Sequence, residues 1–269
     1  MAEPRRPSPG LVALVDANAP LWAGEAEVFR SYWDWDGRSR ATDRQWLARQ
    51  CHKELFDGFL PRLSALDAGW PAIGESRAGV LELSKSAYEE LAHYCAFAAA
   101  YDAVRDDDVP LDVDTLRARA WPENAALAEL RAAHIRDHGE LGRRAQAFTE
   151  GGYCTLFSEG MRLRGRGGLD DVIADACALV YADEWEHMLL GIAGLDDDDQ
   201  DVADDGARSP EAWAVLRDLS VAQMETRIRM RNAQFGFPLS ESRVAAILAG
   251  DIVPLAFDYH RAGLAVPTP

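Results

Sequence analysis

A four-residue pattern, Glu-x-x-His, occurs twice in this chain, as Glu90–His93 and as Glu184–His187. Random placement of the 18 Glu and 6 His residues along 269 positions would give about 0.4 such pairs. Both copies lie in apolar stretches with helical periodicity, and residues three apart on a helix share one face. The pattern therefore predicts two helices that each turn a carboxylate and an imidazole toward a common interior.

Two single glutamates complete the pattern on two further predicted helices. Glu54 belongs to an apolar stripe of the first helix and is expected to point into the core. Glu159 lies near the end of the third helix, where an antiparallel neighbour would bring it level with Glu184. His52 and Glu150 remain alternatives, since each lies on the same predicted helix as one of these two.

Hydrophobic residues recur at helical intervals along most of the chain, and no strand-like alternation persists. We therefore predict an all-α fold, with bundle helices over about 42–69, 75–104, 123–164 and 169–195 and additional helices over 207–269. The interval of 69 residues from Glu90 to Glu159 is long and fits one crossover connecting two helical hairpins. The third helix could consist of two pieces that meet near Gly139. Residues 1–20 are rich in Pro, which predicts a flexible tail, and residues 21–269 are expected to form a single helical domain.

Charge and segment composition exclude several classes of function. The net charge of −17 argues against nucleic acid and against anionic membrane surfaces as partners. Neither a signal peptide nor a membrane span is evident, so a cytoplasmic protein is expected. The four cysteines, Cys51, Cys95, Cys154 and Cys177, lack metal-type CxxC spacing and are predicted to be buried free thiols in a reducing cytosol.

The order Glu, ExxH, Glu, ExxH with a long middle connection resembles the ferritin-like diiron-carboxylate superfamily over about residues 42–195. The strings Ser158–Arg164 and Tyr181–His187 are similar to the third and fourth helices of that family. The resemblance implies a four-helix bundle with a long crossover and a hydrogen bond from the His93 imidazole to Asp183 that orients the ring. It also implies two iron ions, or manganese or a mixed Mn/Fe pair, bound by Glu54, Glu90, His93, Glu159, Glu184 and His187.

Four glutamates balance the charge of two Fe²⁺ ions, and imidazole is a suitable iron ligand. The resemblance implies an enzyme that uses O₂ to hydroxylate, N-oxygenate, desaturate or oxidatively cleave a small organic substrate, with a ferredoxin or reductase as electron donor. Radical-generating members carry Tyr one turn after the second-helix His, where this chain has Phe97. A ferroxidase or metal-binding protein without an organic substrate is the main alternative, and a metal-free helical interaction protein is a third.

Three further residues are candidates for roles near the substrate. Thr155, one turn before Glu159, could present a hydroxyl to the oxygen pocket. Arg227 and Arg231 share a helix face and could bind a carboxylate or phosphate of the substrate, although a salt-bridged surface stripe is the favoured interpretation. The pair His134 and His138 is expected to face solvent. The sequence is also compatible with a homodimer.

Overall fold

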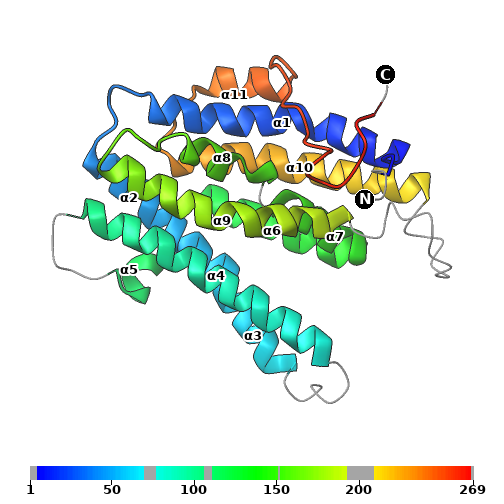
Figure 1. The fold of residues 1–269 in the computed structure, drawn as a ribbon, viewed down its shortest axis with the longest axis horizontal. Coiled ribbons are helices and arrows are strands. Elements are labelled where there is room, and N and C mark those ends of the chain that lie inside the picture. The colour runs from blue at the N-terminus through cyan, green and yellow to red at the C-terminus, as the bar shows by residue number, and fades with distance from the viewer. Residues whose placement is uncertain (1–4, 70–76, 106–110, 151, 193–208, 268–269) are drawn as a thin grey trace.

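The computed structural model describes residues 5–69, 77–105, 111–150, 152–192 and 209–267, and the remaining residues are not considered further. Regular structure in these ranges is helical apart from one isolated bridge between Arg5 and Leu264, so the protein has an all-α fold (Figure 1). The elements in chain order are α1 (Pro9–Trp33), α2 (Arg40–His52), the π-helical segment η1 (Lys53–Phe59), α3 (Leu60–Gly69), α4 (Arg77–Val104), α5 (Val113–Arg117), α6 (Pro122–His138), α7 (Glu140–Glu150), the 3₁₀ turn η3 (Gly152–Cys154), α8 (Thr155–Met161), α9 (Leu169–Ile192), α10 (Pro210–Gln234) and α11 (Glu241–Leu248).

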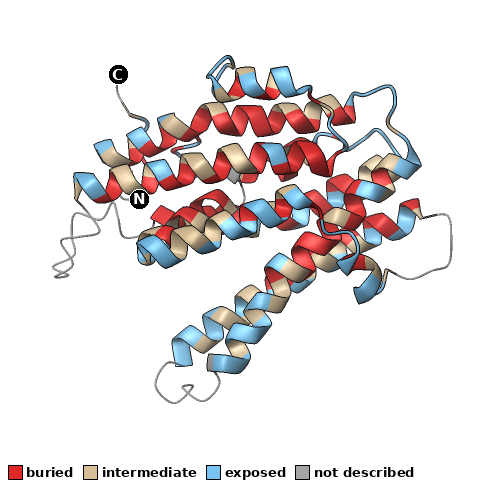
Figure 2. Cartoon of the chain, turned by 180° about the vertical axis from the view of Figure 1, so that it is seen from behind, coloured by how far each residue is buried: buried red, intermediate tan, exposed pale blue. Residues whose placement is uncertain are grey.

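The bundle is organised around α9, which packs against α4, α7 and α8. On its other face α4 contacts the continuous rod formed by α2, η1 and α3. A capping box between Ser39 and Thr42 starts this rod, since each side chain bonds to the other's backbone N–H. The crossover between α4 and α7 contains α5 and α6, and α6 was expected to belong to the third bundle helix. Buried residues concentrate where these helices meet (Figure 2).

The third predicted helix is broken at two places, and the first is the one near Gly139 that the sequence allows. Gly139, with φ of 55°, ends α6, and a second break separates α7 from α8. There Tyr153 and Cys154 adopt left-handed φ angles of 54° and 56°, which are unfavourable for residues with a Cβ. Glu150 and Glu159, expected on one helix, therefore lie on different helices.

The predicted flexible tail over residues 1–20 is wrong from Pro9 onward. Ser8 caps α1 through its hydroxyl, Pro9 occupies the first turn, where its missing N–H costs nothing, and Leu11 and Leu14 are fully buried. The helix packs along α10 and is covered by α11. What looked like a tail is a structural helix of the domain.

The cysteines are all free thiols, as predicted, but their expected burial is wrong for one of them. Cys51, Cys154 and Cys177 are buried, whereas Cys95 is exposed on α4. Burial raises the pKa of the Cys177 thiol to about 12, which keeps it protonated and unreactive at neutral pH.

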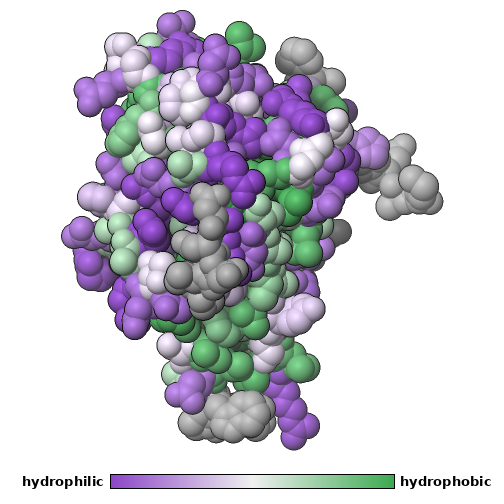
Figure 3. All heavy atoms as spheres, turned by 90° about the vertical axis from the view of Figure 1, so that its left-hand side faces the viewer, coloured by the Kyte–Doolittle hydropathy of each residue, from purple (hydrophilic) through white to green (hydrophobic). Residues whose placement is uncertain are grey.

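The hairpin of α3 and α4 projects from the body of the protein, and much of its distal half is exposed (Figures 1 and 2). Figure 3 shows hydrophobic side chains gathered on the lower part of the surface, where this hairpin lies. Its exposed large hydrophobic residues include Leu63, Leu81 and Tyr88. Within the described ranges, no helix combines the length and apolar character needed to cross a bilayer.

Candidate metal centre

Glu54 enters the bundle interior from the π-helical segment η1 and is fully buried. Such wide turns are rare and occur frequently at functional sites. The Gln50 amide donates a short hydrogen bond to Glu54 Oε1, and Lys53 Nζ lies 3.7 Å from the same oxygen. Oε2 has no hydrogen-bond partner. One oxygen of Glu54 is thus fixed by the protein, and the other is available to a ligand.

The structure brings Glu54, His93 and Glu184 together from η1, α4 and α9. One ligand atom from each lies within 4.8 Å of the others, and all three side chains are buried. Two carboxylates and one imidazole at this separation can bind a single divalent cation. These residues are three of the six that the sequence pattern predicts as ligands.

Each imidazole contacts an acid from the other ExxH helix. His93 Nε2 lies 3.0 Å from Asp183 Oδ2, the contact expected from the sequence. His187 Nε2 lies 3.5 Å from Glu89 Oε2, a contact that the sequence analysis missed. The sequence does contain a signal for this contact, because an acidic residue immediately precedes the Glu of both Glu-x-x-His motifs. An acid on Nε2 holds the proton there and leaves the Nδ1 lone pair free to bind a metal.

Four buried ligand-type atoms in this region have no hydrogen-bond partner, which is unfavourable for a metal-free interior. They are Glu54 Oε2, His93 Nδ1, Glu184 Oε2 and His187 Nδ1. His187 Nδ1 lies 3.9 Å from Glu184 Oε2, and His93 Nδ1 lies 4.0 Å from Glu90 Oε2. Oxygen and imidazole donors of this kind are what a divalent transition metal requires, so the residues present fit such an ion.

Glu90 and Glu150 flank the cluster and share one cation. Arg62 Nη2 lies 2.9 Å from Glu90 Oε1 and 3.3 Å from Glu150 Oε1. Burial and the neighbouring Glu54 raise the pKa of Glu90 well above its usual value, although Arg62 opposes this. Burial also acts to raise the pKa of Glu150, but Arg62, then His187, outweigh it and lower the pKa to about 2. Glu150 therefore carries its charge next to His187, whereas Glu90 experiences strong repulsion from the other carboxylates.

Glycine is required where Glu90 approaches η1. A Cβ placed on Gly58 would lie 2.1 Å from Glu90 Oε2, far inside van der Waals contact. The absence of a side chain at Gly58 therefore makes room for the Glu90 carboxylate.

Glu159, a predicted ligand, does not join the cluster. Its carboxylate pairs with Arg30 at 2.9 Å and with Arg162 at 3.1 Å, beside a surface hollow that Arg166 also lines. The broken helix explains the difference, because α8 does not continue the register of α7. Glu150, the alternative from the same region, occupies the place beside Glu90 and His187 instead. The other rival, His52, lies 2.8 Å through Nδ1 from the Leu116 carbonyl oxygen and is not among the clustered residues.

Arg227 and Arg231 form neither a surface stripe nor part of any cavity described here. Both are fully buried on α10 and pair with Glu25 of α1, with Nε to Oε1 distances of 2.7 and 3.3 Å. The Thr155 hydroxyl donates to the other Glu25 oxygen, so it is committed to this network rather than presented to a pocket. Arg231 also donates to Gln50, whose amide in turn bonds to Glu54. These predicted substrate contacts are therefore structural partners that reach the cluster only through Gln50.

The two histidines of α6 are not both solvent-facing. His134 is half-buried and its Nδ1 lies 3.0 Å from Gln223 Nε2, while His138 is exposed.

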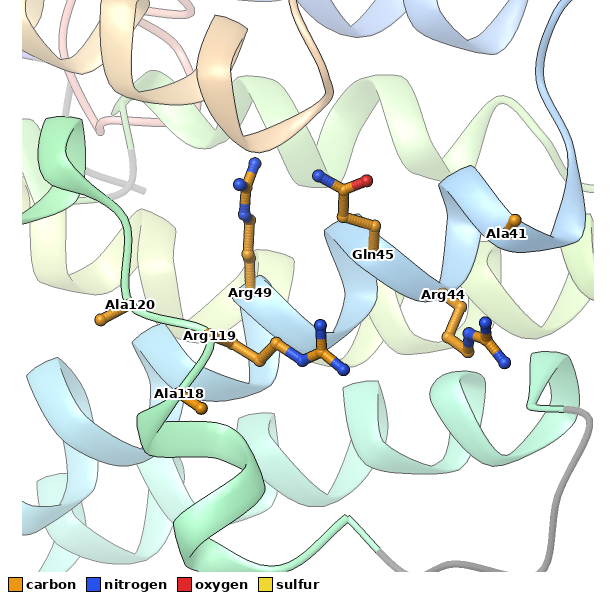
Figure 4. Close-up of a pocket in the computed structure, with 7 residues that line it drawn as sticks. All are labelled: Ala41, Arg44, Gln45, Arg49, Ala118, Arg119 and Ala120. Carbon is orange, nitrogen blue, oxygen red and sulfur yellow. The ribbon is translucent and has the colours of Figure 1, made fainter.

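Two cavities were considered as binding sites. One, of about 280 Å³, lies between α2 and the segment after α5 and is lined by Arg44, Arg49 and Arg119 (Figure 4). It contains no carboxylate or imidazole, and Arg49 is already bonded to the Ala233 carbonyl oxygen at 2.6 Å. The other, of about 360 Å³, lies among η1, α3, α6 and α7 and includes Glu150 in its wall. Only this second cavity shares a residue with the acidic region around the cluster.

No protein-family model, curated protein or solved structure matches this chain.

Proposed function

We propose that the protein is a ferritin-like, non-heme dinuclear iron enzyme that uses O₂ to oxidise a small organic substrate. The observation that carries this proposal is the set of four buried, unpartnered ligand atoms, one on η1 and three on two helices that share the same acid-Glu-x-x-His sequence. Hydrogen bonding alone leaves these atoms unsatisfied, whereas metal ions would satisfy all of them.

The assignment of ligands follows from position and charge. Glu54, His93 and Glu184 would hold one ion, and Glu90, Glu150 and His187 are the remaining donors for a second. Four carboxylates in one buried region repel one another strongly without cations. Two divalent ions would neutralise all four, which makes the interior electrostatically tolerable. Glu150 takes the place that the sequence analysis gave to Glu159.

The surrounding residues prepare these donors for their roles. Asp183 and Glu89 keep the imidazole protons on Nε2 and fix the two rings. Gln50 and Lys53 restrain one oxygen of Glu54, and Glu54, His93 and Glu184 are buried. When bound, an iron pair of this type would supply electrons to O₂ and oxidising power toward a substrate. A ferredoxin or reductase would supply the electrons that the substrate does not provide. Manganese or a mixed Mn/Fe pair could bind to the same ligands.

The decisive experiment is metal stoichiometry after anaerobic reconstitution with Fe²⁺. Wild type should bind about two ions per chain, and Glu90→Ala, Glu150→Ala and His187→Ala should each lose at least one. Glu159→Ala is the matched control, because that carboxylate pairs with Arg30 and Arg162 outside the cluster and its removal should leave the stoichiometry unchanged. Wild type without bound metal, or full retention in all three ligand variants, would refute the proposal.

The cavity beside Glu150 favours an organic substrate over a ferroxidase that stores or oxidises iron alone. The two functions differ in their products. An oxygenase or oxidase should consume O₂ in proportion to an oxidised organic product, whereas a ferroxidase should consume it in proportion to added Fe²⁺ with no such product.

A further inference from the structure

The cavity among η1, α3, α6 and α7, which we name the α6 cavity, extends from the surface to the acidic region of the bundle. Its volume of about 360 Å³ lies in the range of small-molecule sites. Gly58 and Glu150 form part of its wall. Since Gly58 adjoins Glu90 and Glu150 is ion-paired to the same guanidinium as Glu90, the inner end of the cavity borders the candidate ligands.

One part of the α6 cavity is apolar. Leu127 and Ile135 contribute from α6, and Phe56 and Pro61 contribute from the rod opposite. Ala128 and Ala132, whose side chains are small, leave space between these walls. An apolar molecular body placed here would be removed from water, which favours binding.

Three of the four charged residues of the α6 cavity bond to a charged or amide side chain. Lys53 lies 3.7 Å from Glu54, Asp57 accepts a 2.7 Å hydrogen bond from Asn124, and Glu150 pairs with Arg62.

Arg131 is the exception. Its Nη2 donates only to the Thr149 carbonyl and hydroxyl oxygens, at 3.3 and 3.4 Å. No carboxylate in the described part of the chain lies within ion-pair distance of it, and its buried Nε has no partner. Burial lowers the pKa of Arg131 to about 10, so the side chain is still a cation at neutral pH.

We propose that the α6 cavity binds a small monocarboxylic acid, with Arg131 as the residue that binds its carboxylate. One unpaired guanidinium matches one negative charge, and its free N–H groups match the two oxygens of a carboxylate. The apolar body then lies between α6 and the rod, next to Glu150. This inference rests on the proposed function, because the bound acid would be the substrate that the metal centre oxidises.

The test compares a charged probe with a neutral isostere on reconstituted, full-length protein. Binding of 4-phenylbutyrate and of 4-phenylbutyramide is measured by isothermal titration calorimetry for wild type, Arg131→Gln and Arg136→Gln. Arg136 is the matched control, because it lies on the same helix but is exposed and pairs with Asp137. The acid should bind wild type and Arg136→Gln with equal affinity. It should bind Arg131→Gln about tenfold or more weakly, because that variant loses a charge-assisted hydrogen bond. The amide should bind weakly and equally to all three.

A second variant tests the location independently of charge. Ala128→Phe places an aromatic ring in the α6 cavity and should abolish binding of the acid, with unchanged helicity by circular dichroism. Equal acid affinity in wild type and Arg131→Gln, or undiminished binding to Ala128→Phe, would overturn the inference.

Metal content is measured for every sample, so that the two proposals fail separately. Two ions per chain without Arg131-dependent acid binding refutes only the substrate class. Arg131-dependent acid binding to a protein that cannot hold metal supports the acid site and refutes the proposed oxidation chemistry.

Discussion

At the scale of single residues, the candidate metal centre depends on contacts exchanged between two helices. The acid of each motif contacts the imidazole of the other, so Asp183 of α9 supports His93 of α4, and Glu89 of α4 supports His187 of α9. Neither helix can orient its own imidazole in this way. A correct metal centre therefore requires that α4 and α9 pack in one register.

We predict that Asp183→Asn and Glu89→Gln each weaken metal binding by roughly 10- to 100-fold without removing a ligand. An amide can present its NH₂ group to Nε2, which favours the wrong tautomer, whereas the carboxylate holds the proton on Nε2. Competition with a fluorescent chelator measures the affinity. Glu186→Gln is the control, because that acid is exposed and pairs with Lys85 rather than with an imidazole. Unchanged affinity in both test variants would show that these acids do not orient the imidazoles.

At the scale of elements, the close approach of α7 to α9 decides where Glu150 lies relative to Glu184. Gly191 permits this approach, since a Cβ there would lie 2.5 Å from the Phe148 backbone nitrogen and 2.8 Å from the Arg144 carbonyl oxygen. Backbone atoms cannot rotate away as a flexible side chain can. A larger residue must therefore separate the two helices.

Gly191→Ala is expected to destabilise the protein by about 1–3 kcal/mol, the usual cost of overpacking, and to lower the affinity for the second metal ion. Urea unfolding and metal titration measure the two effects. Leu190→Ala, at the neighbouring exposed position, should change neither metal affinity nor the spacing of the helices. Gly191→Ala with wild-type stability and metal affinity would mean that α7 is free to shift.

The helices of the bundle could be predicted from hydrophobic periodicity, because a buried helix face repeats at helical intervals whatever its neighbours do. The break between α7 and α8 was not predicted. Gly151 and Gly152 are unfavourable for a helix, but nothing in Tyr153 and Cys154 themselves indicates left-handed φ angles. The ligand Glu159 was therefore predicted in place of Glu150. The π-helical turn at Glu54 was equally hidden, because tertiary packing rather than composition selects it. Arg227 and Arg231 are buried because they pair with Glu25 of α1, and the spacing of residues along α10 does not reveal that partner.

At the scale of the whole molecule, a buried polar network links the outer helices to the acidic cluster. Glu25 of α1 binds Arg227 and Arg231 of α10, and Gln50 continues the network to Glu54. The carboxylates of the cluster and the two that flank it, those of Glu54, Glu184, Glu90 and Glu150, belong to η1, α9, α4 and α7. They therefore connect both hairpins of the bundle. Repulsion among them opposes assembly of the whole fold, and any cation that relieves it stabilises that fold.

Metal binding is therefore expected to stabilise the entire domain. A ligand that binds only the folded state at about 100 times its dissociation constant adds about 2.7 kcal/mol, and at about 2–4 °C per kcal/mol for domains of 150–250 residues this raises Tm by about 5–10 °C. Differential scanning calorimetry of chelator-treated protein with and without added Mn²⁺ measures the shift. Glu159→Gln should show the same shift as wild type, and Glu54→Gln should lose most of it, since Glu54 lies in the cluster and Glu159 does not. A wild-type Tm that does not respond to the metal, or equal shifts in both variants, would contradict a cation site that joins the two hairpins.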